Sequence, residues 1–231
     1  MTDLEPATSP TERTRLRRKP DRGSHERAVI NEILDEGVVG QLAFAIDGRP
    51  WTVPMLYGRV DDLVYLHGSA ANHALRGAAG GIEVCLGVTL FDGLVLARSA
   101  FHMSMNYRSV MIFGTATRVD DPKEKDRALT AVVEHVVPGR TADIRAPTER
   151  ELATTLVLAL GLEEASAKVR TGGPIDETED LGLPAWAGVI PLTMHAGRPI
   201  PDEHVQPGNA APAYASSYRR PQSDLGSGIC R

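Results

Sequence analysis

The stretch from Thr89 to Val119 constrains the fold more than any other part of the chain. It holds two short apolar runs, Thr89–Phe91 and Leu94–Leu96, which are separated by Asp92-Gly93. Asp-Gly between apolar runs favours a β-hairpin turn, because both residues tolerate the positive φ that tight turns need. A further strand is expected around Val110–Phe113, where apolar residues return. The stretch therefore predicts antiparallel strands, with a tight turn at Asp92-Gly93.

A polar interruption rich in hydrogen-bond donors separates these strands. Its members are Arg98, Ser99, His102, Ser104, Asn106, Tyr107, Arg108 and Ser109. Two strands that bracket a cationic, hydroxyl-rich corner can hold a phosphate group or an anionic ring. The alternative is that the arginines are solvated strand-end residues and the hydroxyls stabilise turns. The density of donors between two apolar strands favours the first interpretation for the group as a whole.

The length and charge of the chain narrow the class of protein. A chain of 231 residues is long enough for one domain with a substantial core. The net charge of -5 argues against a general nucleic-acid or anionic-membrane surface. No apolar run is long enough to span a bilayer, and the polar N-terminus does not resemble a signal peptide. We therefore expect a cytoplasmic protein without nucleic-acid or membrane partners.

The two cysteines predict neither a disulfide nor a metal site. Cys85 lies in a strand-like run, whereas Cys230 lies in a Gly- and Ser-rich tail. This placement makes a structural disulfide unexpected and fits a reducing compartment. The two cysteines are also too far apart in sequence to form a pair with the spacing of zinc ligands.

The first half of the chain reads as one helix followed by an antiparallel meander. Ser24 is a suitable N-cap for a helix that runs to about Glu36, and Gly37 stops it. The connections that follow are too short for parallel crossovers, so neighbouring strands should be antiparallel. The expected strands are Val38–Ile46, Pro50–Val60 and Leu63–His67.

The segment from Gly68 to Arg76 turns from a strand into a short helix, which Ser69 or Asn72 can cap. A helix N-terminus presents free N–H groups and a partial positive charge, which suits a phosphate. An ordinary strand-to-helix connection explains the same residues, and both interpretations stay open.

Two more helices and two more strands are expected in the second half. Asp121-Pro122 favours a helix start, because an N-cap is followed by a proline at the first helical position. Thr148–Glu151 forms a capping box for a helix with leucines spaced along it as far as Leu160. An exposed strand is expected at Glu163–Arg170, and a last strand at Trp186–Met194.

The ends of the chain differ in composition from its middle. Residues 1–12 are expected to be disordered, residues 13–200 to form the domain, and residues 201–231 to be a flexible or surface-wrapped tail. The basic run 11–22 precedes an acidic domain, so it reads as a packed or surface-draped arm rather than a nucleic-acid-binding one.

Five segments of the sequence together resemble one known family. They are GSHERAVINEILDEG, YLHGSAANHALR, VTLFDGLVLARSAFHMSMNYRSVMIFG, SAKVRTGGP and WAGVIPL. With the order of the expected elements, they resemble the flavin-nucleotide-binding branch of the pyridoxamine 5'-phosphate oxidase-like proteins. That branch includes nitroimidazole-resistance-type reductases. The resemblance extends from about Arg13 to Pro201.

This resemblance implies an α+β, mainly β fold for residues 13–200. The implied fold is a split β-barrel, an antiparallel six-stranded FMN-binding barrel with peripheral helices. It also implies a homodimer, with one FMN in each of two sites at the subunit interface, and a small-molecule substrate. Haem and a deazaflavin stay open as alternative cofactors.

The candidate cofactor residues follow from matching segments. The backbone of Pro54–Tyr57 is expected to run along the flavin ring. The turn after His67 matches the phosphate side, although Ala70 and Ala71 stand near where related oxidases carry a basic pair. The phosphate charge is therefore expected from Arg98, Arg108 or Arg76. The full candidate set is Pro54, Met55, Leu56, Tyr57, His67, Ser69, Asn72, His73, Arg98, Ser99, Tyr107, Arg108, Ser109, Lys168, Arg170 and Trp186.

Tyr107, Arg108 and Ser109 match the strand that donates hydrogen bonds to the flavin or its ribityl chain. Lys168, Arg170 and Trp186 match positions where the partner subunit closes the pocket. Met103 stands where related sequences often show a second histidine, which argues against a role that needs a histidine pair.

Two function classes follow from this reading. The first is an FMN-dependent oxidoreductase that uses a nicotinamide or similar electron donor on a small molecule. The second is a non-catalytic flavin or haem module for binding or sensing, with His67, His73 or His102 as the haem ligand. His102 is the candidate catalytic residue, as a proton donor to substrate, and its alternative is a structural hydrogen-bonding role.

Overall fold

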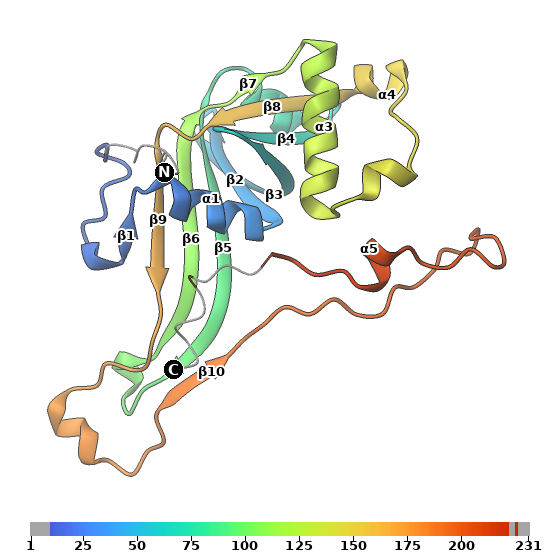
Figure 1. Ribbon diagram of the computed structural model, residues 1–231. Helices are drawn as coiled ribbons and strands as arrows, with labels where there is room; N and C mark the ends of the chain where they lie inside the picture. The colour runs from blue at the N-terminus through green and yellow to red at the C-terminus, as the bar shows by residue number, and fades with distance from the viewer. Residues whose placement is uncertain (1–9, 222–224, 226–231) are drawn as a thin grey trace, which may run out of the picture.

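The computed structural model describes residues 10–221 and 225, and its centre is one antiparallel sheet. The sheet curls around a core, while β5 and β6 run on beyond it to form an arm with β10 (Figure 1). The strands are β1 (Gly23–Ser24), β2 (Val39–Ile46), β3 (Arg49–Val60), β4 (Leu63–Ser69), β5 (Glu83–Leu96), β6 (Ser104–Thr115), β7 (Thr117–Arg118), β8 (Thr155–Gly161), β9 (Ala165–Arg170) and β10 (Gly188–Pro191). The α-helices are α1 (Arg27–Glu36), α2 (His73–Ala78), α3 (Pro122–Val136), α4 (Glu149–Thr154) and α5 (Ala213–Ser216). The 3-10 helices are η1 (Pro20–Arg22), η2 (Ala100–His102), η3 (Arg140–Asp143) and η4 (Thr178–Gly182).

The sheet is a split barrel rather than a closed one. Its strand order is β1-β9-β6-β5-β2-β3-β4-β8-β7, with β10 on β5. The strands β6 and β7 are consecutive pieces of chain separated by the fully buried Ala116. Because β6 pairs with β5 and β9 while β7 pairs with β8, one continuous stretch links β7, at one end of the strand series, to β6, which is third from the other end. The expected mainly β fold is confirmed, and so are the strands of the first meander.

The core lies inside this barrel. Alternate residues of each strand point inward, as the period of two in a strand requires. The largest buried side chains from the strands are Leu42, Tyr57, Leu66, Leu86, Ile112, Leu158 and Leu160. Helix α1 contributes Ile30, Ile33 and Leu34, which are fully buried against the same cluster. Gly37 ends α1 as expected, and its N–H donates to the Ile33 carbonyl oxygen at 3.0 Å.

Helix α3 packs against the outer face of β3, β4 and β8. Ala128 and Val132 pack there against Tyr65 and Val157 in a second, smaller cluster. The expected helix start is confirmed, because the Asp121 carboxylate accepts a hydrogen bond from a backbone N–H of the first turn at 2.9 Å.

Gly58 sets the distance between α3 and the sheet. A Cβ at this position would lie 2.6 Å from the Val132 nitrogen and 2.7 Å from the Ala131 carbonyl carbon. Both contacts are with backbone, so Gly58→Ala must push the helix away. We expect the free energy of unfolding to fall by about 1–3 kcal/mol in urea denaturation. Gly197→Ala is the control, since nothing lies within 4 Å of its Cβ. Equal stability of both variants would contradict this packing.

His135 gives stability a pH dependence. It lies near the end of α3 with its ring 4.8 Å from that of Tyr57, and its Nε2 is 2.6 Å from the Gly37 carbonyl oxygen. Burial lowers the pKa of His135. The unfolded chain therefore takes up a proton near the usual value of about 6.5, while the folded chain resists it. The contribution of neutral His135 to the free energy of unfolding should be fully present above about pH 6.5. It should be lost as the pH falls through the lowered pKa of the folded state.

One such group changes the free energy of unfolding by at most about 1.4 kcal/mol per pH unit. We expect urea denaturation between pH 7.5 and pH 5.5, values chosen to bracket about 6.5, to show a flatter profile for His135→Gln than for the wild type. Identical slopes would show that His135 does not carry this dependence.

The prediction of a hairpin turn at Asp92-Gly93 is wrong. β5 continues through both residues, and the pairing with β6 shifts between Phe91 and Gly93 as a β-bulge. The actual turn is residues 97–103, which contain η2. The Asp92 side chain is drawn into the protein by Arg108, and a Cβ on Gly93 would lie 2.9 Å from the Ile190 carbonyl oxygen of β10. The glycine is needed for a close strand approach, not for a turn.

The helix expected through Leu160 is also wrong. The capping box at Thr148 is confirmed, but α4 ends at Thr154 and the chain continues as β8. The leucines of β8 face the barrel core, while Val157 and Ala159 face α3. A strand buried on both faces shows no polar alternation, so its apolar run can be mistaken for a helix.

Three smaller expectations are corrected by burial and pairing. β9 is not an exposed strand, because it lies between β1 and β6 in the sheet and its Ala165 and Ala167 side chains are buried in the core. Ser24 belongs to β1, so α1 begins later, with Glu26 as its N-cap residue. The last strand is short and covers only Gly188–Pro191.

The described part of the C-terminal tail returns to the barrel after a long excursion (Figure 1). The Tyr218 hydroxyl donates to the Val136 carbonyl oxygen at 2.7 Å. Arg220 donates to the carbonyl oxygens of Asp35 at 2.6 Å and Glu36 at 3.1 Å. These are carbonyls at the C-terminal end of α1, which lack intrahelical partners. The tail is therefore anchored on the surface at residues 218–220.

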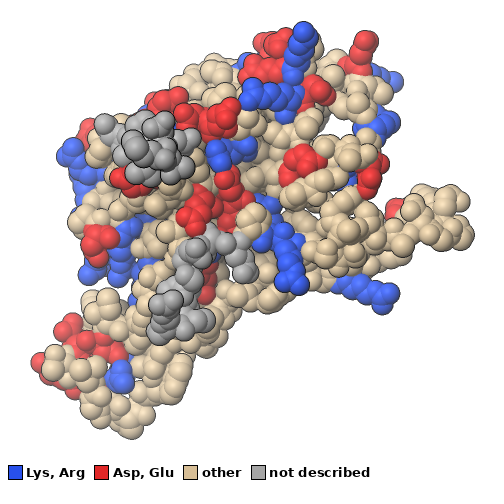
Figure 2. Space-filling model, viewed as in Figure 1, with Lys and Arg blue, Asp and Glu red and all other residues tan. Residues whose placement is uncertain are grey.

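The arm and the barrel differ in surface character. On the face shown in Figure 2, acidic and basic side chains are interspersed over the barrel, whereas much of the arm is uncharged and the charged side chains near its end are mainly acidic. Within residues 10–221, helix length and hydropathy leave no candidate for a membrane-crossing helix.

Candidate cofactor site on the outer face of the sheet

Four of the expected cofactor residues are neighbours on the outer face of β6 and β9. Tyr107 is directly opposite Arg170, and Ser109 is directly opposite Lys168. Directly opposed residues of an antiparallel pair project to the same face. The Ser109 hydroxyl also lies 3.4 Å from the Lys168 carbonyl oxygen. The structure therefore brings these four side chains into one patch.

Arg170 is a buried cation whose hydrogen bonds go to neutral acceptors. It is 4% exposed, and its Nη1 donates to the Asn106 Oδ1 and, at 3.0 Å, to the Gly172 carbonyl oxygen. Its Nη2 donates to the Gly173 carbonyl oxygen at 2.9 Å. Its Nε is buried without a hydrogen-bond partner among the described residues. Burying a charge without a counter-charge is costly, so this position suits an anion.

The basic arm before the domain contributes to the same patch. β1 pairs with β9 so that Gly23 is opposite Lys168, and the Lys168 Nζ lies 3.5 Å from the Arg18 carbonyl oxygen. This packing confirms the draped arm expected from the sequence. Burial first, and then the charge of Arg22, lowers the pKa of Arg170. Arg22 was not among the sequence candidates, and only the basic composition of the arm could have indicated it.

The charge of Arg98, at the turn of the arm, is already neutralised by Asp176. Its Nη1 donates to the Asp176 Oδ2 at 2.8 Å, and its backbone N–H donates to the Asp176 Oδ1 at 2.9 Å. The Arg98 Nε and the Ser99 hydroxyl are buried without partners among the described residues. Arg98 therefore brings no net charge to a phosphate, contrary to the expectation from its place in the corner.

Arg108 does not supply the expected phosphate charge either. It is 4% exposed and donates to both carboxylate oxygens of Asp92, at 2.9 and 2.7 Å, and to the Glu36 carboxylate. Burial acts to lower the pKa of Arg108, but these hydrogen bonds outweigh it and raise the pKa. The side chain points toward α1 on the inner face. Arg108 thus joins α1, β5 and β6 in the fold.

The segment expected along the flavin ring alternates between the two faces. Met55 and Tyr57 are buried in the core, and the Tyr57 hydroxyl donates to the Leu34 carbonyl oxygen at 2.6 Å. Pro54 and Leu56 point outward, with Leu56 42% exposed. Contacts from this segment to a ligand are therefore limited to its backbone and these two side chains.

The turn after β4 has the geometry of an ordinary capped connection. The Ser69 hydroxyl accepts from the Ala71 N–H at 3.2 Å, and the Asn72 Oδ1 accepts from the Leu75 N–H at 3.3 Å. The side chain of His73 lies outside the described residues. His67 is half-buried, and its Nδ1 is buried without a partner among the described residues. Burial lowers the pKa of His67, which favours the neutral imidazole.

The two expected halves of the site lie at opposite ends of the sheet. The turn and α2 adjoin Ile46, at the end where Glu83 pairs with Thr115. Tyr107 lies near the other end of β6. At a rise of about 3.3 Å per residue, Tyr107 and Thr115 are roughly 26 Å apart. One copy of the chain therefore does not bring both halves to one phosphate.

The remaining two candidates lie on the arm. The His102 Nε2 is 3.4 Å from the Glu177 carboxylate, and the His102 side chain is mostly covered. Trp186 is 67% exposed, with its ring beside Gly188. Across residues 10–221, no group of three or more metal-ligating side chains is found together.

The comparison with known proteins decides the family. A family model described as pyridoxamine 5'-phosphate oxidase matches residues 26–169. The chain belongs to the pyridoxamine 5'-phosphate oxidase family. The family expected from the sequence motifs is thus confirmed. A comparison with curated proteins finds no match.

Two solved structures are similar to this chain over nearly their whole length. The flavocytochrome Anf3 from Azotobacter vinelandii is 34% identical with a TM-score of 0.86, covering 92% of this chain and 99% of its own. An FAD and haem binding protein from Mycobacterium smegmatis is 37% identical with a TM-score of 0.81, covering 85% of this chain and 96% of its own.

A more distant solved structure supports only the fold of this chain. It is a protein named for 5-nitroimidazole antibiotic resistance from Bacteroides thetaiotaomicron, 22% identical with a TM-score of 0.53. It covers 62% of this chain and 83% of its own.

Proposed function

We propose that this member of the family is a homodimeric redox protein that binds a flavin nucleotide on the outer face of β6 and β9, and haem at His67. The observation that carries the flavin part is Arg170, a buried cation with an unpartnered Nε beside Tyr107 and Lys168. Phosphate groups are the anions for which arginine and lysine are best suited. The likeness to a flavocytochrome over nearly the whole chain supports the same proposal.

The flavin is proposed to be FAD rather than the FMN expected from the motifs. The support is the solved relative at 37% identity, which is named for FAD and haem. A dinucleotide brings two linked phosphates, which matches a patch that contains Lys168 and Arg170 with Arg22 close by.

The homodimer is proposed from the surface around this patch. Seven large apolar side chains on this side of the sheet are between 41% and 47% exposed, which is unusual unless another surface covers them. They are Val39, Leu56, Phe91, Leu94, Met105, Met111 and Ile190. A second copy with two-fold symmetry is the commonest cover. It would also let the β4 turn of one copy approach the Arg170 end of the other.

Haem is proposed at His67 because this side chain has a free, neutral ligand atom. Its Nδ1 lacks a hydrogen-bond partner in the part of the chain that the structure describes, whereas the ring of His135 is committed to the Gly37 carbonyl oxygen. A neutral imidazole is the form that ligates iron. When bound, the flavin and haem would supply two-electron and one-electron transfer. His102, next to Glu177, is proposed to hold a proton for a small-molecule substrate.

The test is the absorption spectrum and size of the purified full chain. We expect flavin bands that reduced nicotinamide bleaches, a Soret band, and a dimer of the 24.9 kDa chain. His67→Ala should lose the Soret band and keep the flavin, while the exposed His195→Ala keeps both. His102→Gln should lower turnover without lowering flavin retention. A monomer that takes up neither FAD, FMN nor haemin would overturn the proposal.

A further inference from the structure

A partly open cavity of about 550 Å³ lies beside α3. It is bordered by α3, η3 and the segment that leads into α4. Its volume falls in the range of small-molecule sites, which is about 300–1,000 Å³. Its lining residues are Asp126, Leu129, Thr130, Val133, Thr141, Ile144, Arg145, Ala146, Pro147 and Glu151.

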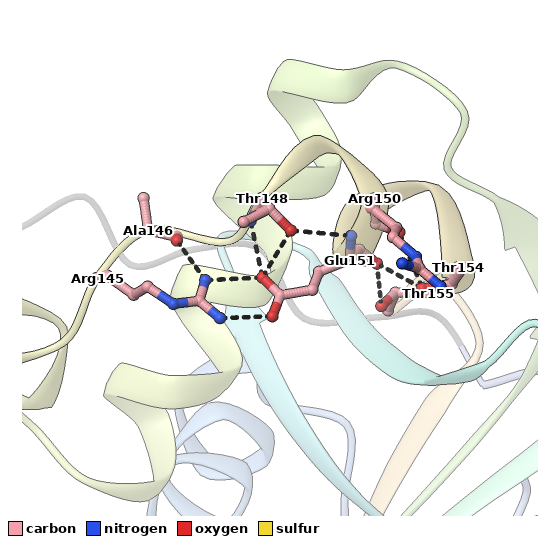
Figure 3. A network of polar contacts seen from close by, with 7 residues as sticks. All are labelled: Arg145, Ala146, Thr148, Arg150, Glu151, Thr154 and Thr155. Carbon is pink, nitrogen blue, oxygen red and sulfur yellow. Dashed lines mark hydrogen bonds and ion pairs between the residues drawn. The ribbon is translucent and has the colours of Figure 1, made fainter.

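One wall of this cavity is built from polar contacts. Arg145 donates to both oxygens of Glu151, at 2.8 and 2.6 Å, and the Thr148 N–H donates to the same carboxylate at 2.8 Å. Figure 3 shows Glu151 directed back from α4 toward Arg145 and Thr148. The hydrogen bond from Arg145, followed by those from Thr148, lowers the pKa of Glu151 to about 2, so the pair stays ionised. The wall is therefore formed before any ligand arrives.

The chemistry of the lining excludes the two cofactors already proposed. Arg145 is the one cation among the lining residues, and its charge is matched by Glu151. A flavin phosphate would find no available cation there. The lining also contains no His, Cys, Met or Tyr that could ligate haem. The cavity is therefore separate from the flavin and haem sites.

What the lining offers instead is an apolar floor and one available anion. Leu129, Val133 and Ile144 supply much of the apolar surface. The Asp126 carboxylate has neither a hydrogen bond nor an ion pair with any described residue, and the charges of Arg145 and Glu151 cancel. The net charge of the lining is thus that of one carboxylate. Its complement is a ligand with an apolar body and a single positive charge.

We propose that this cavity is a binding site for a small apolar amine, whose ammonium group pairs with Asp126 while its body packs on Leu129, Val133 and Ile144. The proposal does not depend on the flavin or haem site. A site of this kind beside α3 gives the protein a means to sense or accept an aromatic or aliphatic amine.

Three probes that share a phenylethyl body test it on the full chain, namely 2-phenylethylamine, 2-phenylethanol and 3-phenylpropionate, with calorimetry as the measurement. We expect the amine to bind at least tenfold more tightly than the carboxylate, with the alcohol between them. Asp126→Asn should bring the amine to the level of the alcohol. Asp180→Asn, the same charge change in η4, should leave the order intact.

Ile144→Trp should block the cavity and abolish binding of all three probes. Far-ultraviolet circular dichroism checks that this variant is folded, and Asp126→Asn gives an independent test if it is not. The proposal is overturned if the amine does not bind, if the carboxylate binds as tightly as the amine, or if folded Ile144→Trp still binds the amine.

Discussion

Arg108→Ala is expected to lower the free energy of unfolding by about 3–5 kcal/mol, because it leaves the carboxylates of Asp92 and Glu36 buried without their cation. The guanidinium donates to both carboxylates, and each of the three side chains is largely buried. Urea denaturation monitored by circular dichroism measures the change.

Arg118→Ala is the matched control for this variant. Arg118 pairs with Asp120 on the surface, where both side chains are mostly exposed. Surface substitutions of this kind change stability by about 0.5 kcal/mol or less. If Arg108→Ala were as stable as this control and instead lost flavin, Arg108 would belong to the cofactor site rather than to the fold.

The second large effect is expected at Arg170. Arg170→Gln should weaken binding of FAD or FMN by about 10- to 100-fold, since a hydrogen bond to a charged group contributes about 1.5–3 kcal/mol. Binding of riboflavin, which lacks the phosphate, should change little. Fluorescence titration of the apoprotein with the three flavins measures both quantities. Arg170→Lys should keep part of the affinity for the nucleotides, because it retains the charge.

The ratio of nucleotide to riboflavin affinity separates a phosphate contact from a general loss of folding. A destabilised protein should lose both ligands together, so the ratio would stay constant. Arg118→Gln controls for the removal of a positive charge elsewhere. An unchanged ratio in Arg170→Gln would remove Arg170 from the phosphate site.

Local sequence signals predicted the elements whose boundaries depend on a few neighbouring residues. Gly37 ends α1, Asp121 caps α3, and the capping box at Thr148 starts α4, as expected. The hairpins among β2, β3 and β4 were also predictable, since short connections leave antiparallel pairing as the one option. Errors arose where an element is buried on both faces, as in β8, or where a distant strand approaches, as β10 approaches Gly93.

The candidate site likewise combines features set by local sequence with features set by distant contacts. Tyr107, Ser109, Lys168 and Arg170 were all expected from motifs, and the pairing of β6 with β9 places them together. The motifs could not show which arginines already have counter-charges. Asp92 is close to Arg108 in sequence, but Glu36 is 72 positions away and Asp176 is 78 positions from Arg98. Arg22 was missed because its neighbour Arg170 is reached only through the pairing of β1 with β9.

The sequence by itself determined the family, the antiparallel meander and the segments in which the cofactor residues lie. Turns, caps and strand periodicity are set by contacts within a few residues, so they can be read along the chain. Only the tertiary structure decided which cations are neutralised and which face each side chain occupies. Those properties depend on charges and strands brought together from distant positions. For that reason alone, the hydrogen bonds of Arg170 go to neutral acceptors, whereas Arg98 and Arg108 bind carboxylates.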